Sequence, residues 1–465
     1  MQIPILNGTF SDDSPDLRVA YPRNMQPVPV QTGISNGYLR PTEGIIKVNE
    51  GPGTDRGSIN WNGRHYRVMG TKLVEVTING AVNELGDVGP GDWVTFDYSF
   101  DYLAIASGGR LYYWDGGILT QVTDPDLGVV LDVIWVDGYF MTTDGEFLIV
   151  TELNDPFSVL PTKYGSSEID PDPVEALLKL KNEPYALNRY TIEVFDDIGG
   201  NGFPFQRIDG AQIEKGTVGT HTCCLFGDAI AFMGSGRNES ISIYLAASGS
   251  SARIATREID LQLKAYSELE LAAAKIEERM DAGHQLLYVH LPNKTLVYDA
   301  AASKIVGQPV WFIQSSSLTE SIYRARNFVW VYDRWWVGDP TSHWMGYLSE
   351  KISEHWGQKI GWEFNTGIVY NESNGAIFHE LELVCLTGRN ALNTNSTLWT
   401  QYSFDGEVWS MPKSIRTGTI GNRQKRLIWL YQGSMNHWRI QRFFGTSDAQ
   451  IAPVRLEARL EALAW

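Results

Sequence analysis

The chain has 465 residues, of which 43% are hydrophobic and 20% are charged, and its formal net charge is −17. This composition is typical of a folded soluble protein with one to three domains, and its three cysteines exclude a disulfide scaffold and offer no zinc-ligand spacing. No run of about 20 apolar residues occurs, so we expect no membrane span, and the N-terminus lacks the basic and apolar segments of a signal peptide.

Residues 1–60 are rich in Pro and Gly and contain few apolar runs. We expect them to form an extended arm that wraps the body of the protein or a neighbour, with a disordered tail as the alternative. Tyr38, Leu39 and the nearby isoleucines favour the arm, because apolar side chains need burial. Tyr38 and Leu39 are therefore candidate assembly contacts.

Short strands separated by tight turns begin at Trp61, and the first units start near residues 65, 102 and 139. Their turns contain Asp-Gly and Gly-Gly pairs, which supply the positive φ angles of tight hairpins. Three- to four-stranded units at this spacing predict a β-propeller of six or seven blades over residues 61–375. A pair of β-sandwiches is the alternative.

One segment of this body breaks the strand pattern. From Asp260 to Met280 there is no Gly and no Pro, and apolar residues that include Leu269 and Ile276 recur at helical spacing. Asp260 offers an N-cap. The pattern predicts one long helix, inserted in the propeller at about residues 258–282. No blade accounts for its apolar stripe, so Leu269 and Ile276 are candidate assembly contacts.

Longer alternating strands follow and predict a separate C-terminal antiparallel domain, sandwich-like, over residues 376–465. The charge is also unevenly placed. Between Glu75 and Glu175 there are 19 acidic residues and two basic ones, whereas Lys413 to Arg442 holds seven basic residues and no acid. The acidic window predicts one face with a strong negative field. For the basic window, a sheet face that meets acidic neighbours is favoured over a surface that binds DNA.

No residue pattern indicates catalysis. Nucleophile-elbow and phosphate-loop motifs are absent. Ser403 to Trp409 is one residue short of the Asp-box turn of sialidase-like propellers and predicts an Asp-Gly hairpin. Asp170, Asp172 and Glu175 lack the spacing of a calcium loop and are expected in a solvated loop. We expect no enzymatic activity, no metal and no cofactor.

Two blocks of sequence, far apart and in order, resemble a known family. The first is AYPRNMQPVPVQTGISNGYLRPTEGI, from Ala20 to Ile45. The second is IATREID, followed by the expected helix and then GHQLLYVHLPNKTLVYD, ending at Asp299. Both are similar to the packaged-DNA-stabilisation proteins of short-tailed phages, which are the tail hub, or nozzle, proteins typified by phage P22.

The resemblance implies a structural virion protein that is assembled in the host cytoplasm and located in the phage tail. It implies a homo-oligomeric ring, a hexamer, below the portal and adaptor proteins, with tailspikes and a tail needle or plug as neighbours. Such a ring closes the portal–adaptor channel, stabilises packaged DNA and forms part of the ejection conduit. The alternative function is that of a glycan-binding or glycan-processing propeller, for which the sequence places no pair of catalytic carboxylates.

A conduit for DNA also gives the acidic window a role. Duplex DNA carries one negative charge per ~1.7 Å, so a basic wall holds it and an acidic wall lets it slide without sequence-specific binding. We therefore expect Asp97, Asp101, Asp115 and Asp137 to line the channel. The alternative is that these acids coat the outside of the ring and dock a basic partner.

Overall fold

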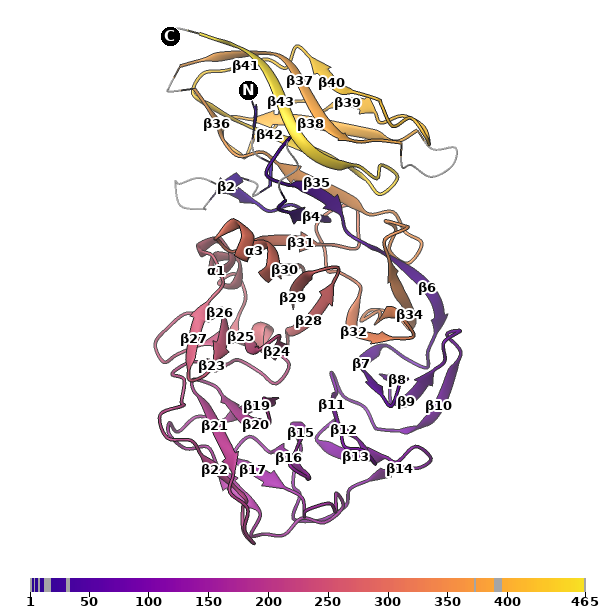
Figure 1. Cartoon of the computed structure of the whole chain (residues 1–465), viewed down its shortest axis with the longest axis vertical. Coiled ribbons are helices and arrows are strands. Elements are labelled where there is room, and N and C mark those ends of the chain that lie inside the picture. Colours follow the sequence, from indigo (N-terminus) through magenta and orange to yellow (C-terminus); the bar gives the residue numbers. More distant parts are fainter. Residues whose placement is uncertain are drawn as a thin grey trace.

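The computed structural model describes residues 2–3, 5–6, 9–11, 18–30, 34–371, 374–388 and 395–463. A ring of small sheets forms the larger body, and a second β-rich body sits at the rim of this ring (Figure 1). The architecture is the expected one, a β-propeller followed by an antiparallel β-sandwich.

Seven blades make up the ring in the described part of the chain, each of them an antiparallel sheet of consecutive strands. Blade 1 consists of β7 (Asp55–Trp61), β8 (Arg64–Met69), β9 (Lys72–Val76) and β10 (Val82–Asp87), and blade 2 of β11 (Thr95–Tyr98), β12 (Leu103–Ser107), β13 (Arg110–Trp114) and β14 (Leu119–Gln121). Blade 3 consists of β15 (Asp132–Val136), β16 (Tyr139–Thr143), β17 (Phe147–Val150) and β18 (Tyr164–Ser166), and blade 4 of β19 (Val174–Leu180), β20 (Glu183–Asn188), β21 (Ile192–Asp197) and β22 (Phe205–Arg207).

The remaining blades follow the same order, with one exception at the end. Blade 5 consists of β23 (Gly216–Thr217), β24 (Cys223–Phe226), β25 (Ala229–Ser235), β26 (Ser242–Ala247) and β27 (Ser250–Arg253). Blade 6 consists of β28 (Lys275–Asp281), β29 (His284–His290), β30 (Thr295–Asp299) and β31 (Trp311–Gln314), and blade 7 of β32 (Arg326–Val331), β33 (Arg334–Gly338), β34 (Trp344–Ser349) and β6 (Gly44–Glu50).

The exception is β6, which closes the ring. It precedes the first blade in the sequence but pairs with β34 of the seventh, from Gly44 opposite Ser349 to Glu50 opposite Trp344. The innermost strands of the seventh and first blades, β32 and β7, lie side by side. Hydrogen bonds between the two ends of the propeller thus hold the ring shut.

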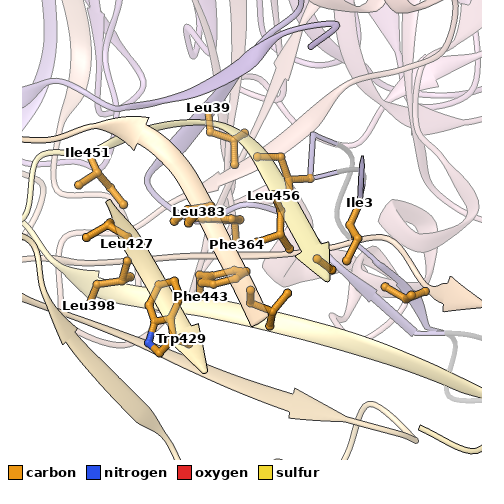
Figure 2. Packing of buried hydrophobic residues seen from close by; sticks show 14 of the residues in the cluster. Ile3, Leu39, Phe364, Leu383, Leu398, Leu427, Trp429, Phe443, Ile451 and Leu456 are labelled. Atoms are coloured by element: carbon orange, nitrogen blue, oxygen red, sulfur yellow. The ribbon is translucent and has the colours of Figure 1, made fainter. Parts of the chain in front are cut away.

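The sandwich has two sheets with a shared core. One consists of β1 (Gln2–Ile3), β43 (Ala452–Ala462), β37 (Ala376–Leu386), β40 (Leu427–Leu430) and β41 (Ser434–Met435), and the other of β35 (Gly361–Asn365), β42 (Trp438–Thr446), β38 (Thr397–Ser403), β39 (Lys413–Arg416) and β36 (Val369–Tyr370). Figure 2 shows their side chains, among them Phe364, Leu383 and Phe443, packed between the sheets.

The N-terminal segment packs against the propeller and the sandwich of its own chain. Two hairpins, β2 (Thr9–Ser11) with β3 (Arg18–Ala20) and β4 (Met25–Val28) with β5 (Tyr38–Pro41), precede the ring. Ile3 and Leu39 are buried in the sandwich core (Figure 2). Because β6 and β7 belong to the ring and β35 pairs with β42, we place the domain boundaries near residues 44 and 361, ahead of the expected 61 and 376.

The expected long helix from Asp260 to Met280 is wrong. The segment forms two short helices, α1 (Arg257–Leu263) and α2 (Glu268–Ala272), and then β28. Ser267 is the N-cap of α2 and forms a reciprocal capping box with Glu270, so a new helix begins here. From Lys275 the chain gains a full ladder of hydrogen bonds with β29, and these tertiary contacts outweigh local helix propensity. A third helix, α3 (Ala300–Val306), follows β30.

Candidate interaction surfaces

Three of the four candidate channel residues lie on one face of the propeller. In an antiparallel blade, the turn from the first to the second strand and the turn from the third to the fourth lie at the same end. Asp101 is in the turn from the first to the second strand of blade 2, Asp115 is in the turn from the third to the fourth strand of that blade, and Asp137 is in the turn from the first to the second strand of blade 3. All three are exposed. The structure thus gathers residues that the sequence separates.

Asp97 differs from the other three because it is half-buried and has ionic and hydrogen-bond partners in other blades. It lies on the innermost strand β11, where its carboxylate accepts a hydrogen bond from the backbone N–H of Trp135 at 2.6 Å and lies 4.0 Å from Nζ of Lys179. Burial raises the pKa of Asp97, against the opposing charge of Lys179. Its contacts join blades 2, 3 and 4, so Asp97 has a structural role in these contacts.

The exposed aspartates hold their turns in shape. Asp115 Oδ1 accepts hydrogen bonds from the backbone N–H groups of Gly117 and Ile118, at 2.8 and 2.7 Å, and these bonds lower its pKa. Asp137 accepts one from Nδ2 of Asn182 at 2.7 Å. None of Asp101, Asp115 and Asp137 has an ion pair within the described residues, so their negative charges face solvent uncompensated.

Large apolar side chains are exposed between these acids. Phe100, next to Asp101, is 91% exposed, Ile118 is 66% exposed and Ile198, on blade 4, is 62% exposed. Exposed apolar groups that share a surface mark sites of protein contact. We call this surface the turn face; on blades 2 to 4 it comprises Phe100, Asp101, Asp115, Ile118, Asp137, Asp196 and Ile198.

A second surface of mixed character lies on the sandwich. Two of the seven basic residues of its basic window are not free cations on the surface: Arg439 is fully buried and Arg442 pairs with Glu363. The exposed cations of β39 lie beside exposed apolar side chains, since Lys413 donates to the carbonyl oxygen of Tyr431 at 2.5 Å. We call this surface the sandwich strip, which comprises Met411, Lys413, Arg416, Leu430 and Tyr431.

The structure separates the four assembly candidates. Ile276 is 2% exposed and Leu39 is fully buried, and both pack in the core of their own chain. Leu269, on α2, is 83% exposed. Tyr38 is half-buried and lines a cavity of about 350 Å³ where the propeller meets the sandwich. Leu269 and Tyr38 are thus the two that remain accessible.

Buried ionic groups join the last blades to the first, and no sequence pattern indicates them. Asp55 of β7 and Arg67 of β8 form a fully buried ion pair at 2.6 Å, and Asn327 of β32 donates to the same carboxylate. In blade 6, Nε2 of His290 lies 3.0 Å from Oε1 of Glu277, whose carboxylate also accepts the backbone N–H of Asn327. These contacts span three blades at the point of ring closure.

Within the described residues, one group of carboxylates has the closeness of metal ligands. Oxygens of Glu43, Asp281 and Glu350 lie within 4.8 Å of one another. Arg279 forms ion pairs with Glu43 at 2.6 Å and with Asp281 at 3.6 Å, so a cation of the chain already compensates part of the negative charge of the group. Burial and the neighbouring Glu43 raise the pKa of Asp281 to about 6. This chemistry fits an ionic contact within the chain better than a metal centre.

The residues weighed as a calcium loop do not form such a group. Asp170 pairs with Arg237 at 2.6 Å, and Asp172 accepts the backbone N–H of Tyr190. The Asp-box-like segment is the expected Asp-Gly turn, in which Asp405 accepts hydrogen bonds from the N–H groups that follow it. In the described part of the chain, no helix is long and apolar enough to cross a membrane.

Comparisons with known proteins match both bodies. Residues 1–353 match the family model Phage_stabilise, described as the β-propeller of bacteriophage P22 Gp10, and residues 361–461 match the model of the β-sandwich of bacteriophage P22 Gp10. The chain is 27% identical over 466 residues to the tail hub protein gp10 of Salmonella phage P22, with 96% of this chain and 95% of that protein covered.

Solved structures give weaker similarities. The WD40 domain of Pan2 from Neurospora crassa has a TM-score of 0.41 at 10% identity, covering 66% of this chain and 94% of that one. The computationally designed protein Ika8 has a TM-score of 0.39 at 13% identity, covering 75% of this chain and 97% of that one. We base no conclusion on similarities of this size.

Proposed function

Because the chain belongs to the phage stabilisation family of bacteriophage P22 Gp10, we propose that it acts as the tail hub subunit in the virion of a short-tailed phage. The observation that carries this proposal is that the match extends over both domains in the same order and over 96% of the chain. A glycan-binding propeller is not favoured, because that relative is a tail hub protein.

We further propose that copies of the chain form a ring, a hexamer, below the portal and adaptor proteins. Tailspikes and a tail needle or plug are its proposed neighbours, and packaged DNA leaves through the ring without sequence-specific binding. The protein is assembled in the host cytoplasm and its role is structural, without catalysis. The closed propeller and the packed sandwich support a structural role, because each offers broad outer surfaces on a rigid frame.

The position of the acids relative to the DNA path stays a prediction. A channel wall that includes Asp97, Asp101, Asp115 and Asp137 would repel phosphates and let DNA slide. The exposed apolar side chains between these acids favour the other possibility, a docking surface, because burial against a protein removes them from water.

The experiment that tests the function uses phage particles. We expect quantitative mass spectrometry of purified virions to find this chain in a fixed ratio to the portal protein, and electron microscopy to place its density in the tail. Particles made without the chain should package DNA and then lose it, and the wild-type chain supplied in trans should restore DNA retention. Virions that lack the chain, or that keep their DNA without it, would contradict the proposal.

A further inference from the structure

Blades 2 to 4 present a surface that combines one sign of charge with apolar groups. Asp101, Asp115, Asp137 and Asp196 are exposed on the turn face, whereas Lys181 is the exposed basic side chain that the described turns of these blades contribute. Phe100, at 91% exposure, stands out between them. An exposed aromatic side chain does not help to hydrate an acidic loop, whereas a large exposed aromatic is typical of a contact anchor.

The sandwich strip has the opposite charge and a similar apolar content. Arg416 has no acidic partner within the described residues, and Lys413 contacts a backbone carbonyl rather than a carboxylate. Beside these cations, Met411 is 86% exposed and Tyr431 is 81% exposed. A surface of this kind offers cations and apolar anchors to an acidic, apolar partner surface.

The two surfaces cannot meet within one molecule. The sandwich lies against the side of the propeller that carries blades 6 and 7 and the β4–β5 hairpin. Blades 2 to 4 occupy the far end of the molecule, at the bottom of Figure 1, and the sandwich occupies the top. Contact between the two therefore requires a second copy of the chain.

We propose that the turn face of blades 2 to 4 of one copy docks on the sandwich strip of the next copy. The contact is head to tail, since it joins two different surfaces, and such contacts close into a ring when the rotation between copies allows it. This inference deepens the proposed ring by naming the surfaces through which its subunits meet. It stands on charge complementarity and on exposed apolar groups at both surfaces.

Self-association of the purified full-length chain provides the test, measured by sedimentation velocity at low and high salt. We expect the wild-type chain to associate, and to do so less at high salt because exposed charges are screened. Asp101→Lys with Asp196→Lys should reduce association at least tenfold, as should Lys413→Glu with Arg416→Glu. Neither Asp101 nor Asp196 has a side-chain hydrogen bond or ion pair within the described residues, so the turn-face variant should fold.

A matched control changes the same charge on the opposite face. Asp92 and Glu168 are exposed in the connections between blades 1 and 2 and between blades 3 and 4, which lie at the other end of the strands. Asp92→Lys with Glu168→Lys should leave association unchanged. The decisive arm mixes the two reversed variants: a basic turn face and an acidic strip should restore association between chains that do not associate alone.

Several results would overturn the proposal. These are a wild-type chain that stays monomeric at its highest soluble concentration, a turn-face variant that associates normally, or a mixture that fails to restore association. A turn-face variant that still associates but no longer binds another tail protein would assign the face to that protein. Detection of the chain in virions is measured separately, so the proposed function and this inference fail independently.

Discussion

His290 and Glu277 form a buried pair whose pKa values are both shifted by the fold. Burial lowers the pKa of His290 to about 4, against the pull of Glu277. Burial alone would raise the pKa of Glu277, but the hydrogen bond from His290 and the charge of Lys275 outweigh it and lower that pKa to about 2. At neutral pH, a neutral imidazole therefore lies with Nε2 3.0 Å from an oxygen of an ionised carboxylate and with Nδ1 3.2 Å from the Thr295 hydroxyl.

These shifts predict a loss of stability in acid. Between the ordinary histidine pKa of 6.5 and the folded value of about 4, the unfolded chain binds a proton that the folded chain does not, so the free energy of unfolding falls as pH falls. His290 should contribute a loss on the order of 3 kcal/mol across this range. Glu277 acts in the same direction, between 4.5 and about 2.

The prediction is measured as a difference between two chains. Chemical denaturation of the wild type and of His290→Gln, which keeps a donor toward Glu277, should give a shallower pH dependence for the variant between pH 6.5 and 4. Asp132 has its pKa raised to about 7 by burial and acts in the opposite direction, which makes the difference more informative than either curve. Equal slopes in the two chains would contradict the assignment.

At the scale of elements, the segment from Arg257 to Asp281 shows how one amphipathic pattern can serve two structures. Ile276 lies on β28 and is buried against the preceding blade, whereas Leu269 lies on the exposed side of a helix of five residues. The two residues have equal apolar character in the sequence. Their burial is decided by the pairing of β28 with β29.

Substitution of the two residues should therefore have different effects. Ile276→Asp places a charge in the core and should leave insoluble or unfolded protein, with a loss of more than about 4 kcal/mol. Leu269→Asp should change the free energy of unfolding by less than about 0.5 kcal/mol. Thermal unfolding and solubility distinguish these outcomes.

Leu269→Asp also tests the role of this residue in assembly. The folded variant should enter particles less well than the wild type if Leu269 contacts a neighbour, and infectivity and particle composition report this. Leu269→Ser provides the control for loss of the apolar group without added charge. Normal incorporation of both variants would remove Leu269 from the assembly surface.

At the scale of the whole molecule, the uneven charge places an acidic propeller end opposite a basic sandwich surface. Conversion of Asp101, Asp115 and Asp137 to Lys distinguishes the two roles considered for the acids. Our docking proposal expects that particles do not assemble with this variant. The channel-wall prediction expects normal assembly and slower DNA ejection, more so at low salt because phosphate contacts are then strongest.

DNA release from purified particles, triggered at two salt concentrations, provides the measurement. Asp97 is left unchanged because its contacts with Trp135 and Lys179 join three blades and its substitution would confound folding with function. The variant with Asp92→Lys and Glu168→Lys is again the control for a general change of charge. Assembled particles that eject at the wild-type rate would contradict both roles.

The sequence by itself determined the parts of this protein that depend on neighbouring residues. Alternating side chains and Asp-Gly turns, such as Asp115-Gly116, predict strands and hairpins because both signals act within a few residues. They were sufficient for the propeller, for the sandwich and, with the two family blocks, for the tail hub function. The acidic window was also visible, although not the direction in which each acid points.

Only the tertiary structure decided what depends on contacts between distant residues. Gly44 pairs opposite Ser349, and no local pattern indicates that β6 belongs to the last blade. The same holds for Asp97, whose carboxylate has its partners in two other blades, and for the expected helix, which is replaced by β28 with Ile276 packed against the preceding blade. In each case long-range strand pairing or burial outweighed a local preference, because a hydrogen-bonded, dehydrated contact contributes more free energy than helix propensity does.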